Sequence, residues 1–147
     1  MEVLMIKNGN QIWEKTISFA RECSWRAGKA LAEKMEKNDF PGWERVIVAV
    51  DNDNIVGFCT IAEKDELSDD YCYSPFIGFM FVDERWRGKR ISEQMINCGC
   101  DYAIELGYQE VFIMSGEKGL YEKYGFKKLG NFETIYGTTD QLFSKKL

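Results

Sequence analysis

The sequence predicts a mixed α/β domain in which helices pack against one central sheet. Strand-like and helix-like segments alternate along its 147 residues. An almost wholly apolar run at residues 76–82 precedes a helical repeat and another apolar strand, which predicts a parallel strand pair joined by a helix. Because 45% of the residues are hydrophobic and 29% are charged, the chain is expected to fold as a single domain over residues 1–147.

The first half of the chain predicts a strand, a helical region and a hairpin. Residues 2–7 suit a short strand, which the turn at residues 8–10 closes. Small or apolar residues then recur every three or four positions, on one face of a helix or of two consecutive helices. This face consists of Trp13, Ile17, Ala20, Ser24, Ala27 and Leu31. Residues 45–50 and 55–62 flank a polar turn and are expected to pair as a hairpin.

The second half predicts further strands around one long helix. Residues 63–73 form an acidic loop, and the apolar run after it is expected to be a strand buried on both faces. A helix over residues 91–106 ends where Gly107 provides a C-terminal cap. The remaining expected elements are a strand at 110–114, a short helix at 119–124, and candidate strands at 126–129, 134–136 and 141–145.

Composition excludes several classes of function. The net charge of −5 is unfavourable for binding nucleic acid. Because the chain has no histidine, Ser-His-Asp and Cys-His catalysis and histidine-ligated metals are excluded, and no metal is expected. The five irregularly spaced cysteines suit free thiols in a reducing compartment. The N-terminus does not resemble a signal peptide and no apolar run reaches membrane length, so a soluble, cytoplasmic protein without membrane contact is expected.

A basic loop between the apolar strand and the long helix is the first candidate site. Four of the six residues from Arg85 to Arg90 are basic in a chain that is acidic overall. The first N–H groups of a helix lack intrahelical partners and carry partial positive charge, so this junction suits a pyrophosphate. Gly88 permits close backbone approach. A solvated basic turn without a ligand and a small nucleic-acid patch are the alternatives.

The segment Arg87-Gly88-Lys89-Arg90-Ile91-Ser92 resembles the acetyl-CoA signature of the GNAT N-acetyltransferase superfamily, Gln/Arg-x-x-Gly-x-Gly/Ala. Arg87 and Gly88 match this signature, whereas Arg90 and Ser92 replace small residues. The resemblance implies acetyl-CoA as cosubstrate, its pyrophosphate held by the amides of this loop. It also implies a mostly antiparallel central sheet with a splayed parallel strand pair. The implied cofactor-binding residues are Phe81, Val82, Arg87, Gly88, Lys89, Arg90, Ile91 and Ser92.

A second segment, Gly119 to Phe126, resembles the family's Phe/Leu-Tyr-Glu-Lys-x-Gly-Phe sequence. By this resemblance Tyr121 is the catalytic proton donor to the leaving thiolate. Tyrosine has an ordinary pKa near ~10 and a thiol near ~8.5, so the phenol is protonated at neutral pH. The alternative is that Tyr121 only packs in the core, which is the expected role of Tyr124.

The resemblance also implies the reaction, which is direct acetyl transfer to an amine in a ternary complex. Backbone N–H groups near Phe81 and Val82 are the expected oxyanion donors. Trp25, Trp43 and Tyr73 are candidates for an acceptor pocket or for core packing. The expected strand at 76–82 contains no carboxylate, so no general base is assigned. The candidates in or beside the acidic loop are Glu63, Asp65, Glu66, Asp69 and Asp70.

The acceptor is expected to be a small-molecule or peptide amine, and the family resemblance allows a homodimer. A non-catalytic acyl-CoA-binding or sensing module on the same fold is the main alternative. Another kind of nucleotide-binding α/β protein is disfavoured, since the chain contains neither a G-x-G-x-x-G nor a Walker lysine motif.

Overall fold

The computed structural model describes all residues from Met1 to Leu147. Its strands are β1 (Glu2–Ile6), β2 (Arg45–Asp51), β3 (Asn54–Ala62), β4 (Phe76–Val82), β5 (Glu110–Ser115), β6 (Lys127–Glu133) and β7 (Thr139–Lys146). Its α-helices are α1 (Trp13–Glu22), α2 (Ala27–Glu36), α3 (Ile91–Glu105) and α4 (Leu120–Lys123), and a 3-10 turn covers Glu84–Trp86. None of these helices combines the length and the hydrophobicity that a bilayer crossing requires.

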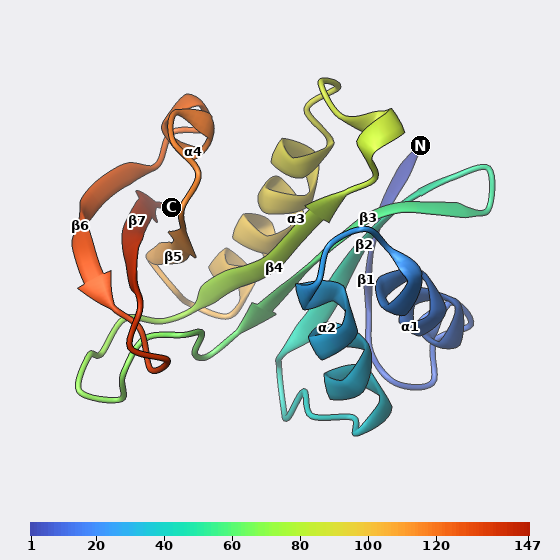
Figure 1. Ribbon diagram of the computed structural model, residues 1–147, viewed down its shortest axis with the longest axis horizontal. Coiled ribbons are helices and arrows are strands. Elements are labelled where there is room, and N and C mark those ends of the chain that lie inside the picture. Colours follow the sequence, from blue (N-terminus) through green and yellow to red (C-terminus); the bar gives the residue numbers. More distant parts are fainter.

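The seven strands form one sheet in the order β1-β2-β3-β4-β5-β7-β6 (Figure 1). Every neighbouring pair is antiparallel except β4 and β5, which run parallel. The predicted class is therefore confirmed, including the strand-helix-strand unit in which α3 connects the parallel pair. The hairpin of β2 and β3 is also confirmed.

Helices cover both faces of the N-terminal part of the sheet. Strand β2 shows why, because Val46 and Val48 pack with α1 and α2, whereas Ile47 and Ala49 pack with α3. Successive side chains of a strand point to opposite faces, so a strand covered on both faces reads as a continuous apolar run. The two hydrophobic clusters thus lie on opposite sides of one layer. Figure 1 shows the helices that cover them, with α1 and α2 on one face of the sheet and α3 on the other.

The long loop between β3 and β4 crosses to the C-terminal strands. Leu67 is buried and forms an isolated antiparallel bridge with Thr134. The N–H of Ile135 donates to the carbonyl oxygen of Glu66 at 2.8 Å. A third hydrophobic cluster lies beneath this loop and joins Leu67 to Phe76, Phe112, Met114 and Leu142. The loop is therefore fixed at both the β3–β4 side and the β6–β7 side of the sheet.

The helical face from Trp13 to Leu31 belongs to two consecutive helices separated at Cys23–Arg26, which is one of the two arrangements expected from the sequence. Two other expectations about the elements need correction. Residues 134–136 do not form a strand, since Gly137 donates to the carbonyl of Thr134 in a turn that leads into β7. Strand β4 is not buried throughout, because Gly78, Phe79 and Met80 are only half-buried beside a cavity.

Candidate active site

A cavity opens in the sheet where β4 and β5 separate. The two strands share a single register pair, Phe76 with Phe112, supported by a hydrogen bond from the N–H of Phe112 to the carbonyl of Pro75 at 3.0 Å. Beyond this point they diverge and enclose a cavity of about 990 Å³. The cavity is lined by both strands, the start of α3, α4, the α1–α2 connection and the β3–β4 loop.

Strand β4 contains a β-bulge where it borders this cavity. Phe58 opposes Phe81 and Thr60 opposes Gly78, so two residues of β4, Phe79 and Met80, face a single position of β3. Phe79 has a φ of +50°, which is a strained left-handed conformation for a bulky residue. A bulge bends its strand and increases the local twist, which is consistent with the divergence from β5. Sequence reasoning missed the bulge because position 79 carries no glycine.

The start of α3 has the geometry that an anion requires. Gly88 has a φ of +81°, and nothing lies within 4 Å of the place where a β-carbon would stand. Arg90 also adopts the left-handed conformation, with a φ of +58°, and no side chain caps the helix. The main-chain amides of the first turn are therefore free of side-chain partners, and they are available to an anionic ligand. The side chain of Arg90 instead pairs with Glu93 through two hydrogen bonds of 2.7 and 2.8 Å.

The other residues of the basic loop take different positions. The guanidinium of Arg87 donates to the carbonyl oxygen of Val82 at 2.9 Å, which ties the loop to the end of β4. The ammonium of Lys89 lies 4.6 Å from the centroid of the Trp86 ring, and Lys89 does not line the cavity. Ile91 is buried in the core below α3. The predicted residues that line the cavity are Phe81, Val82, Arg87, Gly88, Arg90 and Ser92.

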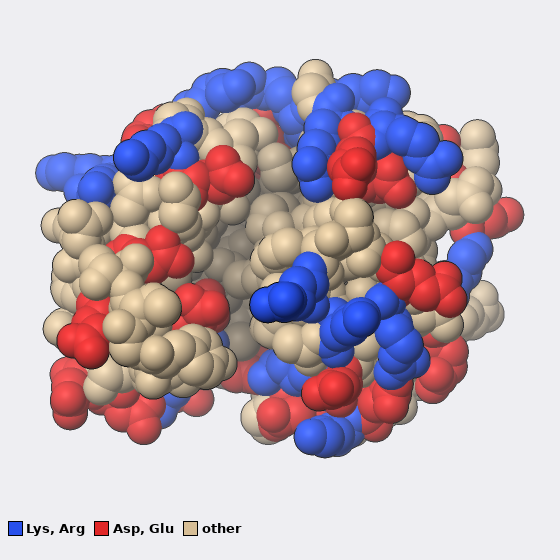
Figure 2. All heavy atoms as spheres, in the orientation of Figure 1, with Lys and Arg blue, Asp and Glu red and all other residues tan.

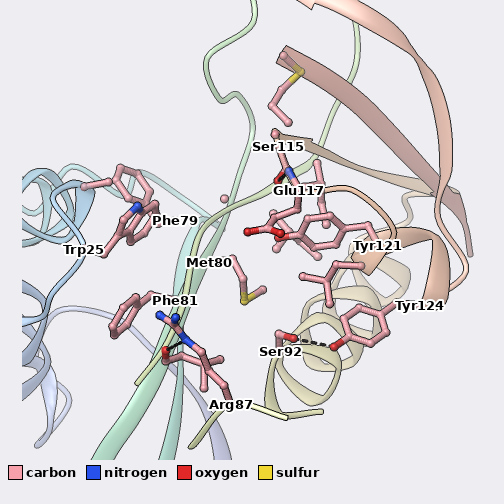
Figure 3. Close-up of a pocket in the computed structure, with 18 of the residues that line it drawn as sticks. Trp25, Phe79, Met80, Phe81, Arg87, Ser92, Ser115, Glu117, Tyr121 and Tyr124 are labelled. Atoms are coloured by element: carbon pink, nitrogen blue, oxygen red, sulfur yellow. Dashed lines mark hydrogen bonds between the residues drawn. The ribbon is translucent and has the colours of Figure 1, made fainter. Parts of the chain in front are cut away.

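Tyr121 both packs in the core and faces the cavity. Its ring is 3% exposed and contacts Phe126 and Phe143, at centroid distances of 6.0 and 5.7 Å. Its hydroxyl points into the opening, near Glu117 and Ser115 (Figure 3). Burial raises the pKa of Tyr121 well above its usual value, so the phenol stays protonated at neutral pH. The packing role and the predicted proton-donor role are therefore compatible in one side chain.

An aromatic wall lies across the cavity from Tyr121. Trp25, from the connection between α1 and α2, stacks on Phe81 with a centroid distance of 6.2 Å and an interplanar angle of 4°. Phe79 meets Trp25 at 6.4 Å in an edge-on arrangement. Figure 3 shows Trp25 and Phe79 on one side of the opening and Tyr121 with Glu117 on the other.

The other two aromatic candidates for an acceptor pocket lie elsewhere. Trp43 packs against Tyr108, with ring centroids 5.6 Å apart, on the side of the sheet that α3 covers. Tyr73 packs against Phe112, with ring centroids 4.9 Å apart, over the third cluster. Neither side chain lines the cavity, so of the two roles considered from the sequence, Trp43 and Tyr73 have the packing role.

Three carboxylates occupy the end of the cavity that is formed by the β3–β4 loop and the start of β7. Asp65 lies over β4, where a β-carbon at Gly78 would stand 3.0 Å from its Oδ2 atom. Asp140 lies beyond the end of β5, where a β-carbon at Gly116 would stand 3.5 Å from its Oδ1 atom. Glu66 also lines the cavity. Two of these three carboxylates belong to the acidic loop predicted from the sequence, whereas Asp140 was not anticipated.

The acidic residues influence one another electrostatically. Burial, reinforced by the negative charge of Glu66 and more weakly of Asp140, raises the pKa of Asp65 to about 7. Burial and the charge of Asp140 also raise the pKa of Glu66. The other acidic candidates predicted from the sequence, Glu63, Asp69 and Asp70, do not line the cavity.

The sheet topology and the opening between its parallel strands define this chain as an α/β domain of the acetyltransferase type. A family model described as an acetyltransferase (GNAT) domain matches residues 42–128, which is more than half of the chain. The chain therefore belongs to the GNAT acetyltransferase family, whose members transfer acetyl groups from acetyl-CoA. Among curated protein sequences, none matches this chain.

Solved structures share the complete fold. An aminoglycoside 6'-acetyltransferase type Ii superimposes with a TM-score of 0.77 at 18% identity, covering 99% of this chain and 97% of that one. An aminoglycoside 6'-N-acetyltransferase from Enterococcus faecium gives a TM-score of 0.73 at 17% identity, with the same coverage. A GNAT family acetyltransferase from Elizabethkingia anophelis with acetyl-CoA bound gives 0.69 at 17% identity, also with that coverage. At these identities the likeness establishes the fold.

Proposed function

We propose that this protein transfers an acetyl group from acetyl-CoA to a primary amine, with both substrates bound together in the cavity between β4 and β5. The observation that carries the proposal is that one continuous cavity reaches both the start of α3 and Tyr121. One surface of this cavity suits phosphates, and the other presents a proton donor. We further propose that residues 1–147 act as one catalytic domain, since a single sheet runs through them.

In this proposal the donor binds along the divergence of the two strands. The amides around Gly88 and the first turn of α3 hold the pyrophosphate, assisted by the charge of Arg87. The thioester then lies beside the bulged part of β4. There, N–H groups near Phe81 and Val82 face the carbonyl oxygen and stabilise the negative charge that develops on it.

The reaction is a direct exchange of bonds. The amine, in its neutral form, attacks the thioester carbonyl carbon, and the carbon–sulfur bond breaks as the amide forms. The nitrogen gives one proton to solvent water, and the departing sulfur takes one from the hydroxyl of Tyr121, which then regains a proton from solvent, so no net proton is lost by the protein. The buried surroundings that keep Tyr121 protonated also disfavour a free thiolate, so the proton passes as the bond breaks.

The decisive experiment combines binding and turnover. Calorimetry is expected to detect binding of coenzyme A, and a thiol-release assay is expected to detect acetyl-CoA consumption that depends on an added amine. No binding of coenzyme A contradicts the proposal as a whole. Binding of coenzyme A without thiol release across a broad set of amines identifies the chain as a non-catalytic acyl-CoA-binding module instead.

A further inference from the structure

The cavity is divided electrostatically into two ends. Its basic residues come from the β4–α3 junction and from α4 and the turn before it, where Glu84 and Glu117 also line the cavity. Around the β3–β4 loop and the start of β7, by contrast, the charged lining residues are all acidic: Asp65, Glu66 and Asp140. Figure 2 shows the corresponding groove, in which blue and red side chains flank the upper end, red ones follow the left wall below it, and blue ones lie on the right. Phosphates of an acyl carrier belong at the basic end, so the acidic end is left for a ligand of opposite charge.

The acidic end is held in place by the fold. The loop bearing Asp65 and Glu66 is fixed to the C-terminal strands through the bridge of Leu67 with Thr134. Asp65 lies over Gly78 of β4, and Asp140 follows Thr139 at the start of β7, which pairs with β5. The carboxylates therefore approach the opening from both of the strands that diverge.

The positive charge of Lys34 acts on Asp65 more weakly than the like charges of Glu66 and Asp140 do. None of Asp65, Glu66 and Asp140 takes part in a salt bridge. Each like charge in such a group opposes ionisation of its neighbours, and a cation placed among them removes that penalty. The arrangement does not suit a metal ion, because no set of three or more acidic or thiol side chains is arranged to hold one. The chemistry therefore favours an organic cation.

We propose that the acceptor is an amine with at least one further positive charge, bound between the carboxylates of Asp65, Glu66 and Asp140 and the aromatic wall of Trp25. This inference rests on the proposed function and specifies its substrate class. One amino group reacts at the thioester, and the second, as an ammonium, is held by the carboxylates. The face of Trp25 adds a favourable surface for the cation and for the carbon chain that carries it.

The test uses the full chain saturated with coenzyme A, and calorimetry with linear alkyl diamines of increasing length. Each diamine is compared with the amino alcohol of the same length, which lacks only the second charge. We expect the best diamine to bind at least about tenfold more tightly than its amino alcohol. In the double variant Asp65→Asn and Asp140→Asn this preference is expected to fall to about twofold or less. Both changes remove repelling charge, so they are not expected to weaken the fold.

A matched control alters the same number of charges outside the cavity. The double variant Glu63→Gln and Asp70→Asn changes two exposed residues of the same loop and is expected to keep the preference for the diamine. The inference is overturned if diamines and amino alcohols bind equally, or if both double variants lose the preference to the same extent. Binding of coenzyme A is measured separately, so failure of this inference is distinguishable from failure of the proposed function.

Discussion

The hydroxyl groups of Ser92 and Tyr124 lie 2.9 Å apart and join the first turn of α3 to the end of α4 (Figure 3). Ser92 occupies the last position of the acetyl-CoA signature, where the family pattern has glycine or alanine. The substitution therefore provides a polar contact between the phosphate-binding turn and the segment that carries Tyr121. Tyr124 is 7% exposed and Ser92 is half-buried, so this hydrogen bond is partly shielded from water.

Replacement of Tyr124 by phenylalanine tests the energetic value of this contact. Removing one partner of a shielded hydrogen bond costs about 1 kcal/mol, so Tyr124→Phe is expected to lower the free energy of unfolding by about that amount. Ser92→Ala is expected to cost a similar amount, and the double variant less than the sum of the two. Denaturant unfolding of all four proteins measures the coupling, and strictly additive costs contradict a direct interaction.

Tyr121→Phe is expected to lower kcat by about 100-fold or more while leaving the Kd of coenzyme A within a few-fold. The ring still fills the same space between Phe126 and Phe143, so the core remains packed and only the proton is lost. Thiol-release kinetics and calorimetry give the two quantities. Tyr124→Phe is the matched control, and an equal loss of kcat in both variants removes the assignment of Tyr121 as proton donor.

The raised pKa of Asp65 predicts a pH-dependent effect of Asp65→Asn on stability. A carboxyl whose pKa is higher in the folded state, here about 7 against an ordinary 3.8, binds its proton more tightly when folded. The free energy of unfolding therefore declines as pH rises from about 4 to about 7. Above pH 7 the Asp65 carboxyl is ionised in both states, and the protein carries the full destabilising effect of its charge. The groups that act on it are Glu66, Asp140 and, in the opposite sense, Lys34.

Asp65→Asn removes the loss of stability that ionisation of the Asp65 carboxyl causes. The variant is expected to melt a few degrees above the parent protein at pH 8, and the difference is expected to shrink as pH falls toward 4. Thermal melts across this range check the prediction. If the difference in melting temperature between the two proteins does not change with pH, the ionisation of Asp65 is not its cause.

Replacing Gly78 or Gly116 by alanine tests how closely the carboxylates of Asp65 and Asp140 lie to these glycines. A methyl group at Gly78 meets the Asp65 carboxylate at 3.0 Å, so Gly78→Ala is expected to displace Asp65 and to weaken diamine binding about tenfold. A methyl group at Gly116 meets Asp140 at 3.5 Å, an ordinary contact, and Gly116→Ala is expected to be tolerated. Calorimetry with a diamine measures both variants, and equal affinities contradict the close placement of Asp65 over β4.

Periodicity predicted most elements because their burial is regular. The helix over 91–106 and the strands at 45–50, 55–62 and 76–82 have boundaries close to those observed. These segments bury one or both faces continuously, and such burial leaves a clear pattern in the sequence. The segment 134–136 misled the prediction because its apolar residues, Ile135 and Tyr136, are exposed in a turn.

The site was predictable only where it depends on local sequence. The basic loop and Tyr121 lie in contiguous motifs, and both reach the same cavity. The bulge at Phe79 depends on the register between β3 and β4. The placement of Asp65 in the same cavity as Asp140 depends on the loop that crosses to the C-terminal strands. Residues 65 and 140 are far apart in the chain, and no period or motif relates them. Their proximity is a property of the tertiary structure alone.

The single register pair between β4 and β5 gives this sheet two additional strand edges in its interior. Exposed edges normally invite pairing with other polypeptides and promote aggregation. Here the two edges face each other across the cavity. Their main-chain hydrogen-bonding groups are therefore available to a small molecule that lies between the two strands.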